Sequence, residues 1–240
     1  MRSSIIADYH LHSNYSPDSK SSVEDIIKVS REKNIEHIII TDHYEIADEH
    51  ENILDVDGYR KKIEKYSLPV GVELGWNGIK ELTVDTTKFD YVLFSHHYIE
   101  EPVNQENYKR YLLRLLDIIN RFDGYHALAH LDFPRRYHEY NEPFSKDLFD
   151  IISEILKTLI KNGKSLELNT APMSIYGEPN PSIEILRLYK SLGGRNITVG
   201  SDAHELEDIG KGINDGIEIL KKLGYNYILV FDIEWKEVRI

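Results

Sequence analysis

Short apolar segments and amphipathic segments alternate along the whole chain of 240 residues, and this alternation restricts the fold more than any other feature. The apolar segments are rich in Ile, Val, Leu and Tyr and are mostly continuous, as in strands buried on both faces of a parallel sheet. The predicted strands are Ile5–His12, His37–Thr41, Leu68–Leu74, Tyr91–Ser95, His126–His130, Ser165–Asn169, Ile197–Gly200 and Tyr227–Phe231. The pattern therefore predicts an α/β fold.

Amphipathic helices are predicted between these strands. Ser21 with Glu24 matches a capping box that opens a helix extending to about Lys33. Further helices are predicted over 108–122, from just after Ser145 to near Gly163, and from Pro181 to Leu192. Repeated units of strand and helix form either an open doubly wound sheet or a closed barrel, and periodicity alone does not choose between them.

Histidine and acidic residues gather where the predicted strands end. Seven of the eleven histidines, with five carboxylates, lie in the segments DYHLH, TDH, GVELG, SHH, AHLD and SDAH. The carboxyl ends of barrel strands meet at one rim, so such side chains would converge there. Because a multinuclear metal site needs imidazoles and carboxylates delivered to one place, the clusters favour a barrel with a metal site at that rim.

The segment DYHLH places His10 and His12 on one face of an extended strand, because successive side chains point to opposite sides. Two imidazoles on one face can hold a single ion, and Asp8 on the same face could orient one of them. The alternative is an edge strand whose polar residues face solvent.

Glu73 interrupts the apolar run Val70–Leu74, where an unpaired carboxylate would be costly in free energy. A bridge between two cations would satisfy both of its oxygens. A buried ion pair with Lys or Arg is the alternative.

The middle clusters each offer one expected ligand. His43 follows the strand predicted to end at Thr41, and its neighbour Asp42 could either ligate or cap the following turn. His96 and His97 are adjacent and should point to opposite sides of their strand, so only one of them is expected to ligate. His130 ends the apolar run ALAHL.

Asp202 and His204 stand two residues apart after the apolar run ITVG, and Asp18 lies in the turn SPDS. The chain has no Cys, which leaves only nitrogen and oxygen ligands. The candidate ligands exceed what one catalytic ion holds, so the sequence predicts two or three divalent ions. Zn, Fe and Mn suit imidazole mixed with carboxylate.

The composition restricts the class of protein. With 41% hydrophobic and 29% charged residues, the chain suits one globular domain over residues 1–240. A net charge of −12 argues against a nucleic-acid-binding surface, and no apolar segment approaches the length of a membrane span. The start MRSSIIADYH lacks a signal-peptide pattern, so we expect a cytoplasmic protein that does not bind membranes.

These clusters, in this order, resemble the polymerase-and-histidinol-phosphatase (PHP) family of phosphoesterases. The similarity extends from DYHLHSNYSPDS to GSDAHELEDIG, and DYVLFSHHYIE, AHLDFPRRY, LELNTAP and EPNPSIEIL are similar to signatures of the histidinol-phosphatase branch. The resemblance implies a distorted TIM-like barrel of seven βα units, (β/α)7, with a trinuclear metal site at the C-terminal ends of the strands.

The resemblance also implies a distribution of the ligands over three metals. One metal would take His10, His12, Glu73 and Asp202; a second, bridged by Glu73, would take His97 and His130; the third would take Asp18, His43 and His204. Alignment makes His97 the ligand, whereas His96 could instead face the substrate. The family's cationic phosphate clamp matches Arg135 and Arg136, since Arg binds phosphate bidentately; the alternative is that one or both are solvated in a loop.

The resulting hypothesis is hydrolysis of a phosphomonoester by a hydroxide that bridges the metals and attacks phosphorus in line. The residues predicted to be catalytic are Glu73, Asp202, His204, Arg135 and Arg136. By resemblance the substrate is L-histidinol phosphate, an intermediate of histidine biosynthesis. The alternatives are a PHP phosphatase for another ester, such as phosphotyrosine or a small sugar or nucleoside phosphate, and a non-catalytic metal-binding module.

Overall fold

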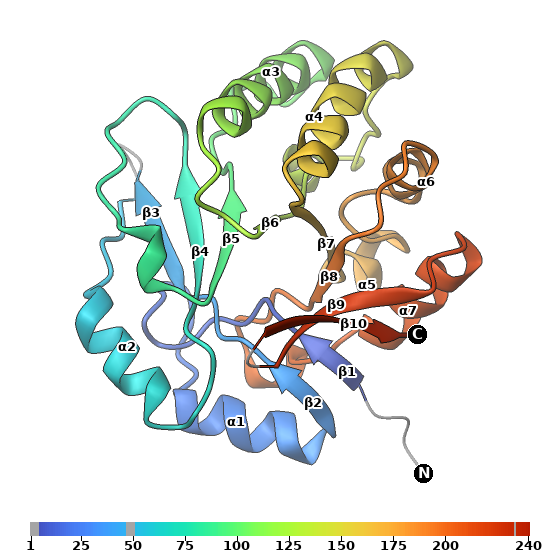
Figure 1. Cartoon of the computed structure of the whole chain (residues 1–240). Coiled ribbons are helices and arrows are strands. Elements are labelled where there is room, and N and C mark those ends of the chain that lie inside the picture. Colours follow the sequence, from blue (N-terminus) through green and yellow to red (C-terminus); the bar gives the residue numbers. More distant parts are fainter. Residues whose placement is uncertain (1–4, 47–50, 233) are drawn as a thin grey trace.

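The computed structural model describes residues 5–46, 51–232 and 234–240, and it has an α/β architecture (Figure 1). The strands are β1 (Ile5–Asp8), β2 (Ile35–Ile38), β3 (His43–Ile46), β4 (Gly71–Trp76), β5 (Tyr91–Ser95), β6 (Ala127–Leu128), β7 (Ser165–Asn169), β8 (Ile197–Gly200), β9 (Tyr227–Asp232) and β10 (Glu234–Arg239). The helices are α1 (Val23–Glu32), α2 (Val56–Glu64), α3 (Gln105–Arg121), α4 (Phe149–Lys161), α5 (Met173–Tyr176), α6 (Ile183–Ser191) and α7 (Ile213–Lys222). The longer helices lie on the outside of the strands (Figure 1).

The central element is a six-stranded parallel sheet in the order β3-β4-β5-β6-β7-β8. Strands β1 and β2 form a separate parallel pair, and β9 and β10 form an antiparallel hairpin. Neighbouring strands of the parallel sheet follow one another in sequence. The chain between two strands therefore returns over the outside of the sheet to the adjacent position. Polar residues at successive strand ends are thereby brought to the same edge.

Backbone hydrogen bonds link the segments that follow β1 and β2 to the main sheet. The amide of Tyr9 donates to the carbonyl of Val199 in β8 at 2.9 Å, and the amide of Thr41 donates to Leu11 at 2.8 Å. Ile40 also forms a parallel bridge with Val70, just before β4. The extension of β1 therefore lies between β8 and the segment after β2, which places DYHLH beside the strands that carry the other polar clusters.

Strand register brings two of these polar residues level with each other. His43 is the first residue of β3, and it pairs with Glu73 of β4. The residues next to Glu73 on its own strand and on β5 are apolar: Val72, Leu74 and Leu93 are all buried. Glu73 is thus held in a dry environment where its carboxylate needs charged or hydrogen-bonding partners.

The predicted elements agree with the structure most closely for β5, β7 and β8, whose bounds match. The strand predicted over His37–Thr41 is displaced: β2 covers Ile35–Ile38, because pairing with β1 ends at Ile38, and a new strand, β3, begins at His43. Strands β3 and β10 and helices α2 and α7 were not predicted.

The predicted capping box is displaced by one residue. Ser22, rather than Ser21, caps α1, and its hydroxyl accepts a hydrogen bond from the Asp25 amide at 3.1 Å. Ser182, directly after Pro181, similarly caps α6. In both cases a serine hydroxyl accepts a hydrogen bond from the backbone amide three residues further on, as expected for an N-cap.

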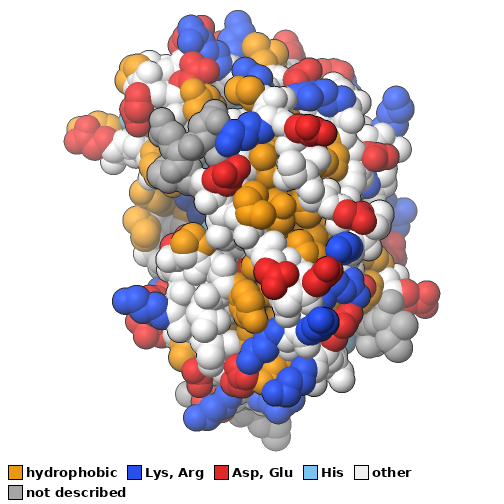
Figure 2. Space-filling view, turned by 90° about the vertical axis from the view of Figure 1, so that its left-hand side faces the viewer, with side chains coloured by type: hydrophobic (Ala, Val, Ile, Leu, Met, Phe, Trp, Pro, Cys, Tyr) orange, Lys and Arg blue, Asp and Glu red, His pale blue; other side chains and the backbone are white. Residues whose placement is uncertain are grey.

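The surface of the described chain carries charges of both signs. On the face that lies at the left of Figure 1, Lys and Arg side chains are interspersed with Asp and Glu around a group of hydrophobic side chains (Figure 2). No helix within the described ranges combines the length and hydropathy needed to cross a bilayer.

Candidate metal centre

Glu73 lines a cavity of about 750 Å³ and faces five imidazoles. Its Oε2 faces Nε2 of His10 at 3.2 Å, Nε2 of His12 at 3.5 Å and Nδ1 of His43 at 3.0 Å. Its Oε1 faces Nε2 of His97 at 3.2 Å and Nε2 of His130 at 3.1 Å. One buried carboxylate therefore separates two sets of imidazole nitrogens, one set on each oxygen.

Asp202, which follows β8, adds a second carboxylate to the first of these sets. Its Oδ1 lies 3.4 Å from Nε2 of both His10 and His12. Its Oδ2 accepts hydrogen bonds from Arg136 at 2.8 Å and from the side chain of Asn169 at 3.1 Å. One oxygen of Asp202 is thus directed at the imidazoles while the other is held in place.

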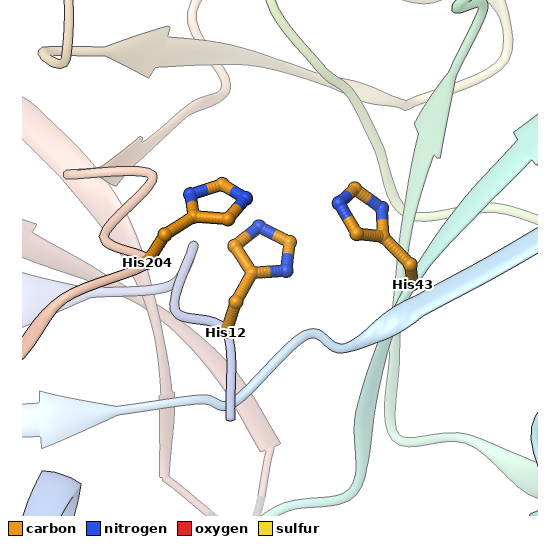
Figure 3. Close-up of side chains that lie close together, drawn as sticks. All are labelled: His12, His43 and His204. Carbon is orange, nitrogen blue, oxygen red and sulfur yellow. The ribbon is translucent and has the colours of Figure 1, made fainter. Parts of the chain in front are cut away.

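The third set lies at the mouth of the cavity. The rings of His12, His43 and His204 come from the segments after β1, at the start of β3 and after β8, and they point toward one another (Figure 3). The ring centroid of His12 is 4.4 Å from that of His43 and 4.1 Å from that of His204. Asp18, half exposed, has Oδ2 3.1 Å from Nε2 of His204 and 3.4 Å from Nε2 of His43.

The buried nitrogen and oxygen atoms at the centre fit divalent cations. Nε2 of His10, Nε2 of His12 and Oε2 of Glu73 are all buried and have no hydrogen-bond partner among the described residues. Buried polar atoms are rarely left without partners, so three of them close together fit a site for a divalent cation. Four overlapping groups of these side chains have ligand atoms close enough to hold an ion.

Charge in the cavity shifts the pKa values of these groups. Burial raises the pKa of Glu73, but the nearby His10 and His43 hold it well below its ordinary value. Burial lowers the pKa of His97, but the Glu73 carboxylate raises it to about 9. Burial and the neighbouring His43 lower the pKa of His12 to about 3. Without a cation, the carboxylates thus keep protons on some imidazoles, and a cation would have to displace those protons.

Two carboxylates, neither of them predicted from the sequence, contact the imidazole nitrogens that point away from Glu73. Oε1 of Glu167 lies 2.6 Å from Nδ1 of His10, and its Oε2 accepts from the backbone amide of His130 at 2.9 Å. Oε2 of Glu45 lies 2.9 Å from Nδ1 of His97. Glu167 interrupts the apolar run SLELN as Glu73 interrupts GVELG, so the same signal could have found it. Glu45, in HYEI, has no such signal.

Asp42 and Asp8 act on the backbone around the centre. Asp42 accepts hydrogen bonds from the amide and hydroxyl of Ser13 and from the hydroxyl of Ser16, so it holds the loop after His12. Asp8, expected to orient an imidazole, instead accepts from the amide and hydroxyl of Ser201. Both carboxylates stabilise the loops on which the candidate ligands lie.

His96 does not face this cavity, although the sequence analysis gave a contact between His96 and the substrate as a possibility. It is buried, and its ring stacks on Tyr111 of α3 with centroids 4.9 Å apart. Its side chain lines a separate cavity of about 410 Å³. Adjacent residues at the end of β5 point to opposite sides, and His97 is the one directed at Glu73.

Of the two arginines predicted to clamp phosphate, the structure brings only Arg136 to the cavity. Arg135 is buried beside it and forms ion pairs with Asp132 at 2.9 Å and Glu178 at 2.7 Å. The segment forms a 3₁₀ turn over Phe133–Tyr137, in which successive side chains point in different directions. Arg135 therefore forms ion pairs within the protein, whereas the sequence predicted it to be a substrate-binding residue.

Comparisons with known proteins agree with this geometry. A family model for the PHP domain matches residues 8–171. A probable histidinol-phosphatase from Thermotoga maritima is 42% identical over 225 residues, which cover 93% of this chain and 94% of that protein. A probable histidinol-phosphatase from Clostridium acetobutylicum is 30% identical over 237 residues, which cover 90% of this chain and 92% of that protein.

A solved structure has the same fold over nearly the whole chain. It is the histidinol phosphate phosphatase from Lactococcus lactis subsp. lactis, crystallised with zinc, L-histidinol and phosphate. The likeness has a TM-score of 0.84 at 24% sequence identity and covers 98% of this chain and 100% of that one. Together with the family model and the two relatives, this shows that the chain belongs to the PHP domain family.

Proposed function

We propose that this protein is a metal-dependent phosphomonoesterase that hydrolyses L-histidinol phosphate to L-histidinol and phosphate, a reaction of histidine biosynthesis. Two relatives named as probable histidinol-phosphatases match it over nearly their whole length. The observation that carries the proposal is the Glu73 carboxylate, which lies between two sets of imidazoles in a cavity that also contains a guanidinium.

We propose three sets of ligands: His10, His12, Glu73 and Asp202 for one ion, Glu73, His97 and His130 for a second, and Asp18, His43 and His204 for a third. The contacts that Glu73, Asp202 and Asp18 make with these imidazoles support the sets. Zn, Fe and Mn all suit this mixture of imidazole and carboxylate. Bound ions of this kind would polarise phosphoryl oxygens and lower the pKa of water toward neutrality.

Arg136 is the residue we propose to hold the phosphoryl group. Its Nη1 donates to Asp202, while its Nε and Nη2 are buried without a hydrogen-bond partner in the described chain. The guanidinium also lies over the ring of Phe133, 5.5 Å from its centroid, which fixes its plane. Two free N–H donors on one rigid plane match two oxygens of a phosphate.

The sequence has no GxSxG nucleophile motif, and this favours attack by water over a covalent intermediate. Asp202 and His204 are each held by neighbours, Asp202 by Arg136 and His204 by Asp18. Both border the cavity, and we propose that they act as ligands; the ions they hold would stabilise the leaving alkoxide.

We also infer that the strands close into a distorted TIM-like (β/α)7 barrel within a single domain. The hydrogen bond from Tyr9 to Val199 and the bridge between Ile40 and Val70 support this, because they connect the segment after β1 to the edge strand β8 and the segment after β2 to the start of β4. A cytoplasmic location remains a prediction from the sequence.

The proposal is tested by phosphate release from purified protein. Chelation should abolish turnover of histidinol phosphate, and Zn²⁺, Mn²⁺ or Fe²⁺ should restore it. Phosphotyrosine, a sugar phosphate and a nucleoside monophosphate serve as comparison substrates. Weak and equal rates on all four esters would contradict the substrate, and metal-loaded protein that releases no phosphate would favour a non-catalytic metal-binding module.

A further inference from the structure

His97 is held from both sides by carboxylates that come from neighbouring strands. Its Nε2 lies 3.2 Å from Oε1 of Glu73, and its Nδ1 lies 2.9 Å from Oε2 of Glu45 in β3. A carboxylate oxygen accepts a hydrogen bond, so Nδ1 carries the proton and donates to Glu45. In the neutral ring the lone pair would then lie on Nε2, which is the nitrogen directed at the centre.

The space for Glu45 is created by a glycine. Gly75 of β4 is the register partner of Glu45 across the parallel pair. A β-carbon at residue 75 would overlap the Glu45 carboxylate, with both oxygens and the carboxyl carbon as its nearest neighbours. Any other residue at this position would therefore displace Glu45 from His97. Because Glu45 is only 9% exposed, it has little room to move aside.

The same arrangement recurs on the other side of Glu73. Nδ1 of His10 lies 2.6 Å from Oε1 of Glu167 in β7, and its Nε2 faces Glu73. A β-carbon at Gly200 would overlap the β-carbon of His10 and lie 2.9 Å from Oε1 of Glu167. Each of these two imidazoles thus has a carboxylate at its Nδ1, and a neighbouring glycine provides the space that this arrangement needs.

We propose that Glu45 is a positioning residue that fixes the tautomer and orientation of His97, and that Gly75 provides the space this requires. The inference rests on the proposed metal centre, because it assigns the free Nε2 of His97 to an ion. A carboxylate behind a metal-binding imidazole orients the ring and makes it a better donor. Glu45 is expected to act through His97, without touching the substrate.

An alternative is that Glu45 binds an ion itself. His43, Glu45 and His97 form one of the groups whose ligand atoms are close enough to share an ion. In that case His97 would use Nδ1, and its Nε2 could not serve the same ion. The nitrogen that faces the central carboxylate is Nε2, which favours the positioning role.

The first measurement is the affinity of metal-free protein for Zn²⁺, obtained by competition with a chromophoric chelator. Glu45→Gln preserves the shape of the side chain but removes the charge and presents an amide that does not fix the tautomer. We expect one bound ion to be weakened about 10- to 100-fold and the others to be unaffected. Glu106→Gln, on the exposed side of α3, is the matched control and should bind like the wild type.

The second measurement is a double-mutant cycle on thermal stability, made without metal. Gly75→Ala should destabilise the wild type but cost clearly less in the Glu45→Ala background, because the carboxylate that it displaces is gone. If Gly75→Ala alone does not fold, recovery of the fold in the double variant demonstrates the same coupling.

Three results would overturn the inference. Equal Zn²⁺ affinity of Glu45→Gln and the wild type would show that His97 does not need Glu45. Additive effects in the cycle would show that Gly75 does not provide space for the carboxylate. A wild-type protein that binds no Zn²⁺ at all would instead overturn the metal centre, and the proposed function with it.

Discussion

Oε1 of Glu167 lies 2.6 Å from Nδ1 of His10, although 157 positions separate the two residues in the chain. The second oxygen of Glu167 accepts from the backbone amide of His130, so one buried carboxylate fixes candidate ligands on both sides of Glu73. The run SLELN is therefore as important to the centre as the histidine clusters themselves.

Glu167→Gln is expected to weaken the centre without changing the candidate ligands. The amide keeps the shape of the carboxylate but is neutral, and it can no longer accept from both His10 and His130 with the same strength. Zn²⁺ affinity should fall about 10- to 100-fold, with a parallel loss of phosphatase activity at limiting metal. Glu154→Gln, exposed on α4, is the control. Unchanged affinity in Glu167→Gln would contradict the role assigned to this residue.

Glu73→Gln should remove nearly all turnover. The variant replaces the carboxylate that faces both sets of imidazoles by an amide, which cannot bridge two cations. We expect kcat to fall by more than about 100-fold and the number of tightly bound ions to decrease, measured by metal analysis after gel filtration. A variant that retains most of its activity with a full complement of metal would disprove the bridging role.

Alanine variants of the two adjacent arginines should differ: one should mainly lose activity, and the other should mainly lose stability. Arg136→Ala removes two N–H donors that have no partner in the described chain, so kcat/KM should fall about 10- to 100-fold. Its thermal stability should fall less than that of Arg135→Ala, because Asp202 keeps its hydrogen bond from Asn169 and its contacts with His10 and His12. Arg135→Ala leaves the fully buried Asp132 without its cation, which is expected to cost about 3–5 kcal/mol of unfolding free energy. Steady-state kinetics and thermal melts of both variants test this. Reversed phenotypes would place the clamp on Arg135.

Metal-free protein should lose stability as pH rises above neutrality. Glu73 raises the pKa of His97 in the folded protein to about 9, above the ordinary value of 6.5. The stabilisation is therefore fully present below about pH 6.5 and is lost as pH rises through about 9. Thermal melts across this range, with His97→Gln as the comparison, should show a decline that the variant lacks. A decline of equal size in His97→Gln would assign it to other groups.

Metal affinity should change in the opposite direction over the same range. A cation can bind His97 only after its proton leaves, so Zn²⁺ affinity is expected to rise between about pH 6.5 and pH 9. Proton release measured during titration in weakly buffered solution checks this directly. Affinity that is independent of pH would mean that His97 is not protonated in the metal-free state.

Much of the fold could be predicted because its signals are local. Continuous apolar runs indicated β5, β7 and β8 with matching bounds, since buried parallel strands need apolar residues on both faces. The strand β3 could not be predicted, because HYEI has no continuous apolar run and pairs only through the register of β4. The N-cap of α1 differed by one residue because Ser21 and Ser22 offer the same hydroxyl, and backbone geometry chooses between them.

The sequence by itself determined the chemistry that is available: nitrogen and oxygen ligands without thiolates, two imidazoles on one face of the first strand, and a carboxylate inside an apolar run. Only the tertiary structure decided which side chains meet. It directs His97 rather than His96 toward Glu73. It pairs Arg135 with a buried carboxylate, while Arg136 lines the cavity. It also places Glu45 within hydrogen-bond distance of His97, and Glu167 within hydrogen-bond distance of His10. These choices depend on strand register and on the direction of single side chains, which are set by packing between segments distant in sequence and leave no local pattern.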